Sequence, residues 1–311
     1  MTKNVKKWTI YRFKVEDGQV GSRLDQFFPN AASELSRSLV RKVIDLGGVH
    51  VNGRRTRTCS QYVSAGDRVE LYLDHMPLNA YRISSQDVVF QDKYLIVLNK
   101  PAMVETQPTH ARYKGTLYEA LQHHLIDPFR PRQKPALGMV QRLDRSTSGL
   151  IVFSIHPEAH KKMTSMFIDG SVEKTYLALV VGQPDPVFGE IQSLLARSRR
   201  ENRVHSVVAG GKLAITRYQT VTTFKNCSLL RIQILTGRSH QIRAHMAESG
   251  CPLIGDQRYG GATSIDALEF SRAMLHAQKL KFSHPVTGQP LDFSLPMPDD
   301  MREAVDFLGR R

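Results

Sequence analysis

The chain has few cysteines and no long apolar segment. Its three cysteines, Cys59, Cys227 and Cys251, lie far apart in the sequence, which argues against a Cys-x-x-Cys metal or redox motif and against a disulfide framework. The longest apolar runs, Leu95–Leu98 and Leu150–Phe153, have the length of a strand, whereas a membrane span needs about 18–20 apolar residues. We therefore expect a soluble protein with no zinc module and no place in a membrane.

Several common signatures are also missing. The first ten residues contain lysine but neither an apolar core nor a small-residue cleavage site, which argues against a secretory signal peptide and favours the cytoplasm. Neither a G-x-G-x-x-G motif nor a P-loop lysine motif occurs, so dinucleotide and nucleoside-triphosphate chemistry lack their usual marks.

Positive charge, in contrast, is abundant. The 311 residues include 43 Lys and Arg against 29 Asp and Glu, a net charge of +14, and 41% of them are hydrophobic. This length suggests about two domains of roughly 100–200 residues each, with at least one sizeable core. The surplus charge is either a means of solubility or the mark of an anionic partner, and its clustering favours the partner.

The pattern along the chain divides it into four parts. Residues 1–17 are polar and predict a short arm or first strand, and residues 18–76 predict a first small domain. A polar stretch over residues 77–87, which contains Pro77 and Asn79, is typical of a linker. Residues 88–311 then form the second domain.

The first domain centres on a helix predicted over Ser33–Leu46. Ser33 is placed to cap its start and Gly47 to end it. The buried face consists of apolar residues spaced four apart: Leu35, Leu39 and Val43. The alternation of Val49–Val51 and the Asn52-Gly53 pair then predict a strand and a hairpin turn.

Basic residues gather on this segment. Arg37 and Arg41 are four apart on the predicted helix, so they share one face, with Lys42 alongside. Three more follow the hairpin turn: Arg54, Arg55 and Arg57. Residues 36–58 contain six basic residues and one acidic residue, a net charge of +5. This density suits phosphate binding, although a solvated helix face beside an arginine-rich turn is the alternative.

The strings GSRLDQFF, SRSLVRKVIDLGGVHVNGRRT and VSAGDRVELYL, within residues 18–73, closely resemble the small RNA-binding domain named after ribosomal protein S4. The resemblance implies that the helix and the following turn contact structured RNA through the basic residues named above. Phosphate contacts of this kind position an RNA without specifying its sequence.

The second domain has a mixed α and β pattern. Predicted strands are Tyr94–Leu98, Leu150–Ile155, Lys174–Val181, Ile215–Val221 and Leu229–Leu235. Predicted helices are Leu117–Leu125, Glu158–Phe167 and Ser239–Ser249. The strict alternation over Leu230–Ile234 indicates a strand with one buried and one wet face, and hence an antiparallel or mixed sheet.

A charged loop leads into an apolar strand at VQRLDRSTSGLIVF, and Asp144 lies at the junction. Its neighbours Arg142 and Arg145 would stabilise the carboxylate if they face it. An ionised carboxylate can attack an electrophilic carbon. The alternative is an aspartate that forms a turn or a surface ion pair.

A second dense segment reads LTGRSHQIRAHMAESGCPLIGDQRYGG, where a strand ends and a helix begins near Ser239. The start of this helix carries Arg238, His240 and Arg243. Such a site favours an anion, either a substrate phosphate or the Asp144 carboxylate. His240 and His245 lack the four-residue spacing of a zincin motif, so we interpret them as structural or RNA-facing.

Three further strings accompany these two segments: NKPA at residues 99–102, EKTYLALVVG between the two segments, and LHAQKLKFSHPVTGQPLDFSLPMP near the end. All five follow one another over residues 88–305. Together they resemble the RluA family of pseudouridine synthases. The resemblance implies an α+β fold, an S4-like domain followed by a catalytic domain with a mainly antiparallel sheet flanked by helices. It also implies that uridine in RNA is isomerised to pseudouridine without a cofactor or metal.

Carried over by motif, Asp144 would be the nucleophile, attacking the ribose C1′ or the uracil C6 or removing a sugar proton. Tyr176 would stack on the flipped base, and Arg238 would pair with the aspartate. The remaining substrate contacts implied or expected are Arg142, which would occupy the space of the flipped uridine, Ile234 and Leu235, which would form an apolar wall, and Arg243.

Three residues depart from the family pattern: Gln141, Met103 and Gln107. They bear on the substrate subgroup rather than on catalysis. The expected substrate is large-subunit ribosomal RNA, with transfer RNA as the nearer alternative, and the expected state is a monomer. A non-catalytic RNA-binding assembly factor is the competing function, while glycoside hydrolysis would need a second acid near Asp144, which the motifs do not offer.

Overall fold

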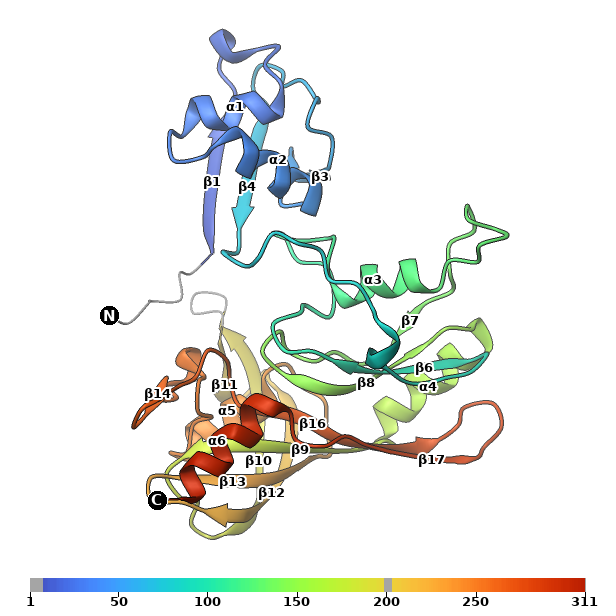
Figure 1. Cartoon of the computed structure of the whole chain (residues 1–311), viewed down its shortest axis with the longest axis vertical. Helices are drawn as coiled ribbons and strands as arrows, with labels where there is room; N and C mark the ends of the chain where they lie inside the picture. Colours follow the sequence, from blue (N-terminus) through green and yellow to red (C-terminus); the bar gives the residue numbers. More distant parts are fainter. Residues whose placement is uncertain (1–7, 199–202, 311) are drawn as a thin grey trace. The chain divides into compact units, whose positions relative to one another are not determined.

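The computed structural model describes residues 8–198 and 203–310, which form two compact units (Figure 1). Unit 1 contains the chain up to Ile83 together with Glu105–Pro128, and unit 2 contains Ser84–Val104 and the chain from Phe129 onward. Residues 105–128, which the sequence pattern placed in the second domain, therefore pack within unit 1. No helix among the described residues is both long and apolar enough to cross a membrane.

Unit 1 is built on an antiparallel sheet in the order β1-β4-β2-β3. Its strands are β1 Thr9–Lys14, β2 Val49–Val51, β3 Arg54–Thr56 and β4 Arg68–Leu73. Within the expected arm or first strand of residues 1–17, Thr9–Lys14 form strand β1, and residues 1–7 lie outside the described residues. Asn52 and Gly53 have φ angles of 50° and 76°, as the expected tight hairpin turn requires, so that prediction is confirmed.

The helices of unit 1 are α1 Leu24–Ala31, α2 Arg37–Leu46 and α3 Leu117–His124, with a short 3-10 turn at Asp17–Gln19. Helix α2 begins later than predicted, because the hydroxyl of Ser36, not Ser33, accepts the Leu39 N–H at 3.2 Å. Gly47, with φ 86°, ends it as expected. The buried stripe is therefore Val40, Val43 and Ile44, whereas Leu39 is only partly covered.

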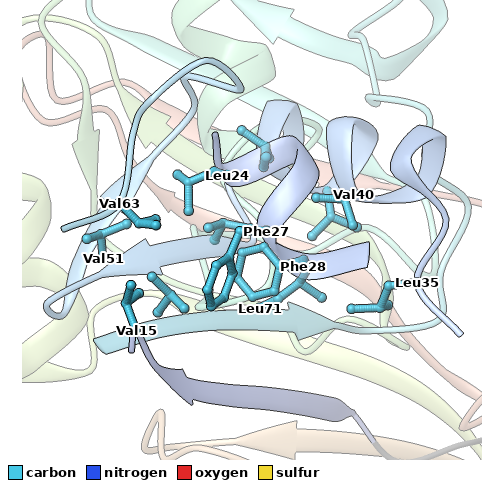
Figure 2. Close-up of a cluster of buried hydrophobic side chains, with 13 residues drawn as sticks. Val15, Leu24, Phe27, Phe28, Leu35, Val40, Val51, Val63 and Leu71 are labelled. Atoms are coloured by element: carbon cyan, nitrogen blue, oxygen red, sulfur yellow. The ribbon is translucent and has the colours of Figure 1, made fainter. Parts of the chain in front are cut away.

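Figure 2 shows the core of unit 1, where the rings of Phe27 and Phe28 lie between the helices and the strand that carries Leu71. The Phe28 ring has no exposed surface. Its centroid lies 5.6 Å from that of Phe27 and 6.2 Å from that of Phe13, in edge-to-face arrangements.

Unit 2 contains a sheet in the order β11-β10-β12-β13-β9-β16-β8-β6-β5, with β17 on β16 and β7 on β8. Neighbours are antiparallel except β8 and β16, which are parallel. The strands are β5 Val88–Gln91, β6 Leu95–Lys100, β7 Gly138–Met139, β8 Ser148–Ser154, β9 Glu173–Val181, β10 Phe188–Ser198, β11 Arg203–Val207, β12 Lys212–Thr223, β13 Cys227–Ile234, β16 Leu275–Ser283 and β17 Pro290–Ser294. The expected mixed, mainly antiparallel sheet is confirmed, and β10 and β11 extend it.

Three helices cover this sheet: α4 Pro157–Asp169, α5 Gln241–Glu248 and α6 Asp299–Gly309. Met163 of α4 packs with β6, β8 and β16, Ala244 of α5 with β10 to β12, and Met301 of α6 with β9 and β13. A ladder of β14 Ser264–Ile265 and β15 Leu268–Glu269 and 3-10 turns at Ser85–Asp87 and Gln257–Tyr259 complete the unit.

Close packing of β8 on β16 requires a glycine in the strand that follows Asp144. Gly149 has φ 110°, and a Cβ there would lie 2.3 Å from the carbonyl oxygen of Ala277. Only glycine fits both the backbone conformation and the space. The apolar strand predicted from SGLIVF is thus held directly against β16, and its seven residues are all buried.

We expect Phe28→Ala to destabilise unit 1 by about 3–5 kcal/mol, because it removes a fully buried ring and leaves a cavity. Urea unfolding would measure the loss, and hydrogen exchange should show it in β1 and β4. Phe188→Ala is the matched control, since Phe188 on β10 is 67% exposed. Equal effects of the two substitutions would contradict this account of the core.

Candidate active site

Asp144 lies in the loop that leads into β8. Its carbonyl oxygen accepts the Thr147 N–H at 3.0 Å, which turns the chain into the strand. Lys100, at the end of β6, has no exposed surface. Its ammonium donates to two carbonyl oxygens of its own segment and, at 3.3 Å, to that of Arg145. The NKPA segment therefore supports the loop and brings a buried positive charge close to Asp144.

Arg243 on α5 is the arginine that pairs with Asp144. Its Nη1 donates to Asp144 Oδ2 at 3.0 Å. Its Nε and Nη2 donate to the two oxygens of Asp256 at 2.6 and 2.8 Å, and its guanidinium lies 4.9 Å from the Tyr259 ring centroid. Burial opposes the charge on Arg243, but the bonds to Asp256 and the field of Asp144 raise its pKa overall. The guanidinium is thus fixed on three sides.

The Asp144 side chain is 26% exposed and ionised. Burial opposes its ionisation, but the fields of His240, Arg243 and Lys100 and the Arg243 bond lower its pKa overall. His240 contributes only when protonated, so Arg243 and Lys100 stabilise the carboxylate at neutral pH. The sequence left two anions open for the basic cluster at the start of α5, a substrate phosphate and the Asp144 carboxylate. In the structure Arg243 binds the Asp144 carboxylate.

His240 is the second neighbour of Asp144. Its Nε2 lies 3.9 Å from Asp144 Oδ1, and its Nδ1 lies 2.9 Å from the hydroxyl oxygen of Tyr259. Burial and the fields of Arg243 and Arg258 lower its pKa to about 4. The imidazole is therefore neutral at neutral pH. His245 is different, because it is fully buried between hydroxyl groups of β10 and β12 and is structural.

Tyr176 belongs to β9, where it lies opposite Ile232 of β13 and Ala277 of β16. Its side chain is near Asp144. It is 6% exposed, and burial together with the negative charge of Asp144 raises its pKa, so the phenol stays protonated. Ile234 occupies the diagonal position of the same ladder, which puts it on the same face of the sheet. Leu235 follows the strand end and is half-buried.

One arginine takes another position than expected. Arg238 is exposed, and its Nε donates to the carbonyl oxygen of Leu213 at 2.8 Å. The predicted pairing of Arg238 with the aspartate is corrected, because Arg243 makes that contact. The reason is local: His240 has a left-handed φ of 52°, so the helix starts at Gln241 and its first turn carries Arg243 inward. Arg142 is exposed, with a long 3.5 Å approach to a serine hydroxyl.

Two charged residues of the site, Lys100 and Asp256, were not predicted from the sequence. Lys100 lies in the string NKPA and Asp256 in the string LIGDQRYGG, which both belong to the family resemblance. Each of the two residues follows an apolar run, and each is buried. A charged side chain at the end of an apolar run is the signal that could have indicated them, since a buried charge requires a partner.

The three departures from the family pattern have different surroundings. Met103 has φ 65° and donates its N–H to the Arg145 carbonyl oxygen at 2.7 Å, so the chain keeps the left-handed conformation that glycine adopts most easily. Gln141, three residues before Asp144, has a buried Nε2 with no hydrogen-bond partner in the part of the chain that is described. Gln107 belongs to unit 1.

Side chains suited to a metal ion do not gather in the described structure. Over residues 8–198 and 203–310, no group of three or more His, Cys, Asp or Glu side chains is arranged to hold a metal ion.

Comparisons with known proteins identify the family. A family model described as RNA pseudouridylate synthase matches residues 94–248. The chain is 34% identical over 300 residues to ribosomal large subunit pseudouridine synthase D of Zymomonas mobilis, covering 93% of this chain and 94% of that protein. The solved structure of human RNA pseudouridylate synthase domain containing 4 has a similar fold, with a TM-score of 0.60 and 22% identity, over 72% of this chain and 94% of that one.

Fold and sequence together define an RNA-modifying isomerase. The chain belongs to the RNA pseudouridine synthase family, and the RluA-type resemblance is confirmed.

The buried histidines of unit 2 predict a pH dependence of stability. Burial, and for each a nearby arginine, lowers the pKa of His240 and of His276 to about 4, against about 6.5 in the unfolded chain. The unfolded chain then binds more protons between these values, so stability falls as the pH decreases from about 6.5 to about 4. Each histidine contributes a slope of up to about 1.4 kcal/mol per pH unit.

Urea titrations of wild type and His240→Gln between pH 4.5 and 7.5 would measure this slope. Near pH 5, unfolding of His240→Gln should take up about one proton fewer than unfolding of wild type. Unfolding of the double variant with His276→Gln should take up about two fewer. An unchanged slope in both would contradict the assignment.

Proposed function

We propose that this chain converts specific uridines of large-subunit ribosomal RNA to pseudouridine, with Asp144 as the nucleophile. The observation that carries the proposal is an ionised, partly exposed carboxylate of which only Oδ2 is bonded to Arg243. Relatives support the substrate, since ribosomal large subunit pseudouridine synthase D of Vibrio parahaemolyticus is 32% identical over 95% of this chain and 94% of that protein.

The reaction is an isomerisation, so it needs no oxidant and no added atoms. The glycosidic bond breaks, the uracil turns, and a carbon–carbon bond forms. Asp144 would attack the ribose C1′ or the uracil C6, or remove a sugar proton. The buried phenol of Tyr176 would stack on the uracil ring, with Ile234 on the same face of the sheet. Arg142 is exposed and would occupy the space that the flipped nucleotide leaves, offsetting part of the cost of flipping.

For unit 1 we propose an S4-like role in RNA binding. One turn of α2 presents an exposed basic patch formed by Arg37, Ser38, Arg41 and Lys42. Arg37 also donates through Nε and Nη2 to Asp25, at 3.2 and 2.9 Å. Asp25 is fully buried, whereas the Arg37 side chain stays 50% exposed. The bond would hold the guanidinium in one orientation for a phosphate.

The three arginines of the hairpin, Arg54, Arg55 and Arg57, would have different roles in RNA binding. Arg54 and Arg57 are exposed, and the Arg57 guanidinium lies 5.2 Å from the Tyr113 ring centroid. Arg55 is half-buried, donates to the Thr109 carbonyl oxygen and lies 5.9 Å from the same ring. Burial lowers the pKa of Arg55. Arg55 therefore ties the hairpin to the segment 105–128, and Arg54 and Arg57 are the better RNA contacts.

The direct test of the function is Asp144→Asn. Pseudouridine mapping of total RNA would compare cells lacking the protein with cells that carry wild type or the variant. We expect wild type to restore sites in large-subunit ribosomal RNA and the variant to restore none, because loss of a nucleophile costs about 10⁴-fold or more in rate. RNA affinity of the variant should be retained.

Asp169→Asn is the matched control, because Asp169 is an exposed aspartate at the end of α4. Sites restored only in transfer RNA would reject the proposed substrate. Sites restored by Asp144→Asn would reject the proposed nucleophile.

The role of unit 1 is tested by salt dependence. Each phosphate-binding side chain that is removed should reduce the slope of log affinity against log salt by about 1. Arg41→Ala with Lys42→Ala should therefore reduce the slope by about 2 in a filter-binding titration. Lys161→Ala with Lys162→Ala removes the same charge from the exposed side of α4 and is the control. Equal slopes for the two double variants would contradict RNA binding at the basic patch on α2.

A further inference from the structure

Tyr259 contacts both partners of Asp144. It ends the 3-10 turn Gln257–Tyr259 and is 9% exposed. The Arg243 guanidinium lies 4.9 Å from its ring centroid, and its hydroxyl oxygen lies 2.9 Å from His240 Nδ1. The proposed reaction itself does not require a tyrosine at this position, so these contacts need their own explanation.

The contacts of this hydroxyl favour one set of hydrogen-bond directions. The buried N–H of Val204 donates to the hydroxyl oxygen at 2.8 Å. The hydroxyl hydrogen is then left for His240 Nδ1, which is the acceptor that the described residues place within reach. A neutral imidazole that accepts at Nδ1 carries its hydrogen on Nε2. The Nε2–H is therefore on the side of Asp144.

The Nε2 side of His240 faces Asp144. Nε2 is 3.9 Å from Asp144 Oδ1, longer than a hydrogen bond, and catalytic contacts of this kind often shorten when the substrate binds. The charged groups around His240 are Asp144 and Asp256, which favour its protonation, and Arg243 and Arg258, which oppose it together with burial. A neutral imidazole can orient the carboxylate without removing its negative charge.

We propose that Tyr259 and His240 are positioning residues for Asp144: the Tyr259 hydroxyl selects the Nε2–H form of His240, which orients Oδ1, while the Tyr259 ring supports Arg243 at Oδ2. This inference rests on the proposed role of Asp144 as nucleophile. The hydroxyl and the ring act on different oxygens of the same carboxylate, so their effects can be separated.

The first experiment needs no activity. Nitrogen-15 spectra of labelled histidine, with the His240 signals assigned through His240→Gln, report which ring nitrogen carries hydrogen at pH 7. Wild type should show hydrogen on Nε2 alone, and Tyr259→Phe should show a mixture of the two forms. Hydrogen on Nδ1 in wild type would overturn the inference even if the enzyme is active.

The second experiment measures the reaction. Tyr259→Phe keeps the ring under Arg243 and removes the hydroxyl. The value of kcat should fall about 10-fold, while KM for the RNA changes by less than about twofold. Loss of the hydroxyl bond to neutral His240 should also move the acid limb of the rate profile to higher pH, because protonated His240 would pair with Asp144.

Two further variants make the outcome decisive. Tyr218→Phe is the matched control, since the Tyr218 hydroxyl donates to the Pro186 carbonyl oxygen at 3.2 Å on the exposed part of the sheet, and it should behave as wild type. In a His240→Gln background, Tyr259→Phe should have no additional effect on the acid limb. A wild-type kcat and acid limb for Tyr259→Phe would overturn the positioning role, and so would a loss confined to RNA affinity.

Discussion

The active site depends on one guanidinium shared by two carboxylates. Arg243 is bonded to Asp256 through two nitrogens and to Asp144 through the third. The buried Asp256 accepts hydrogen bonds from Nε and Nη2 and so fixes the guanidinium in place, with Nη1 directed at Asp144, to which it donates one hydrogen bond. A buried arginine with only one partner would bind that partner more strongly and hold it at both oxygens. The shared arrangement keeps Asp144 ionised while Arg243 leaves its second oxygen available to react.

The fold brings these three residues together from distant parts of the sequence. Asp144 precedes the interior strand β8, Arg243 lies on the helix that covers β10 to β12, and Asp256 follows that helix. Their positions depend on close backbone packing rather than on side chains alone. Gly149 allows β8 to lie against β16, and Lys100 bonds to the backbone carbonyl beside Asp144. The reaction proposed at Asp144 would therefore rely on buried residues that only support the carboxylate.

Features with local signals could be predicted from the sequence, and those set by distant contacts could not. The hairpin turn between β2 and β3, the end of α2 and the apolar strand β8 depend on neighbouring residues, and the structure has all three. Arg238 and Arg243 are equally basic in the sequence. The left-handed conformation of His240, which is uncommon for any residue other than glycine, decides between them. Likewise, the segment around Arg112 packs within unit 1 through a buried ion pair with Asp74, 38 residues earlier, at 3.0 Å.

The charged groups that would attract RNA are different from those around Asp144. Close to Asp144, the charges of Arg243 and Lys100 are matched by those of Asp144 and Asp256, His240 is neutral, and Arg258 adds one further positive charge. Such a site carries little net charge and can accept an uncharged base. Most of the net charge of +14 therefore lies elsewhere, and exposed basic side chains such as those on α2 in unit 1 are suited to attracting RNA. An enzyme arranged in this way would bind RNA by its backbone and reserve the ionised carboxylate for the nucleotide that is flipped into the site.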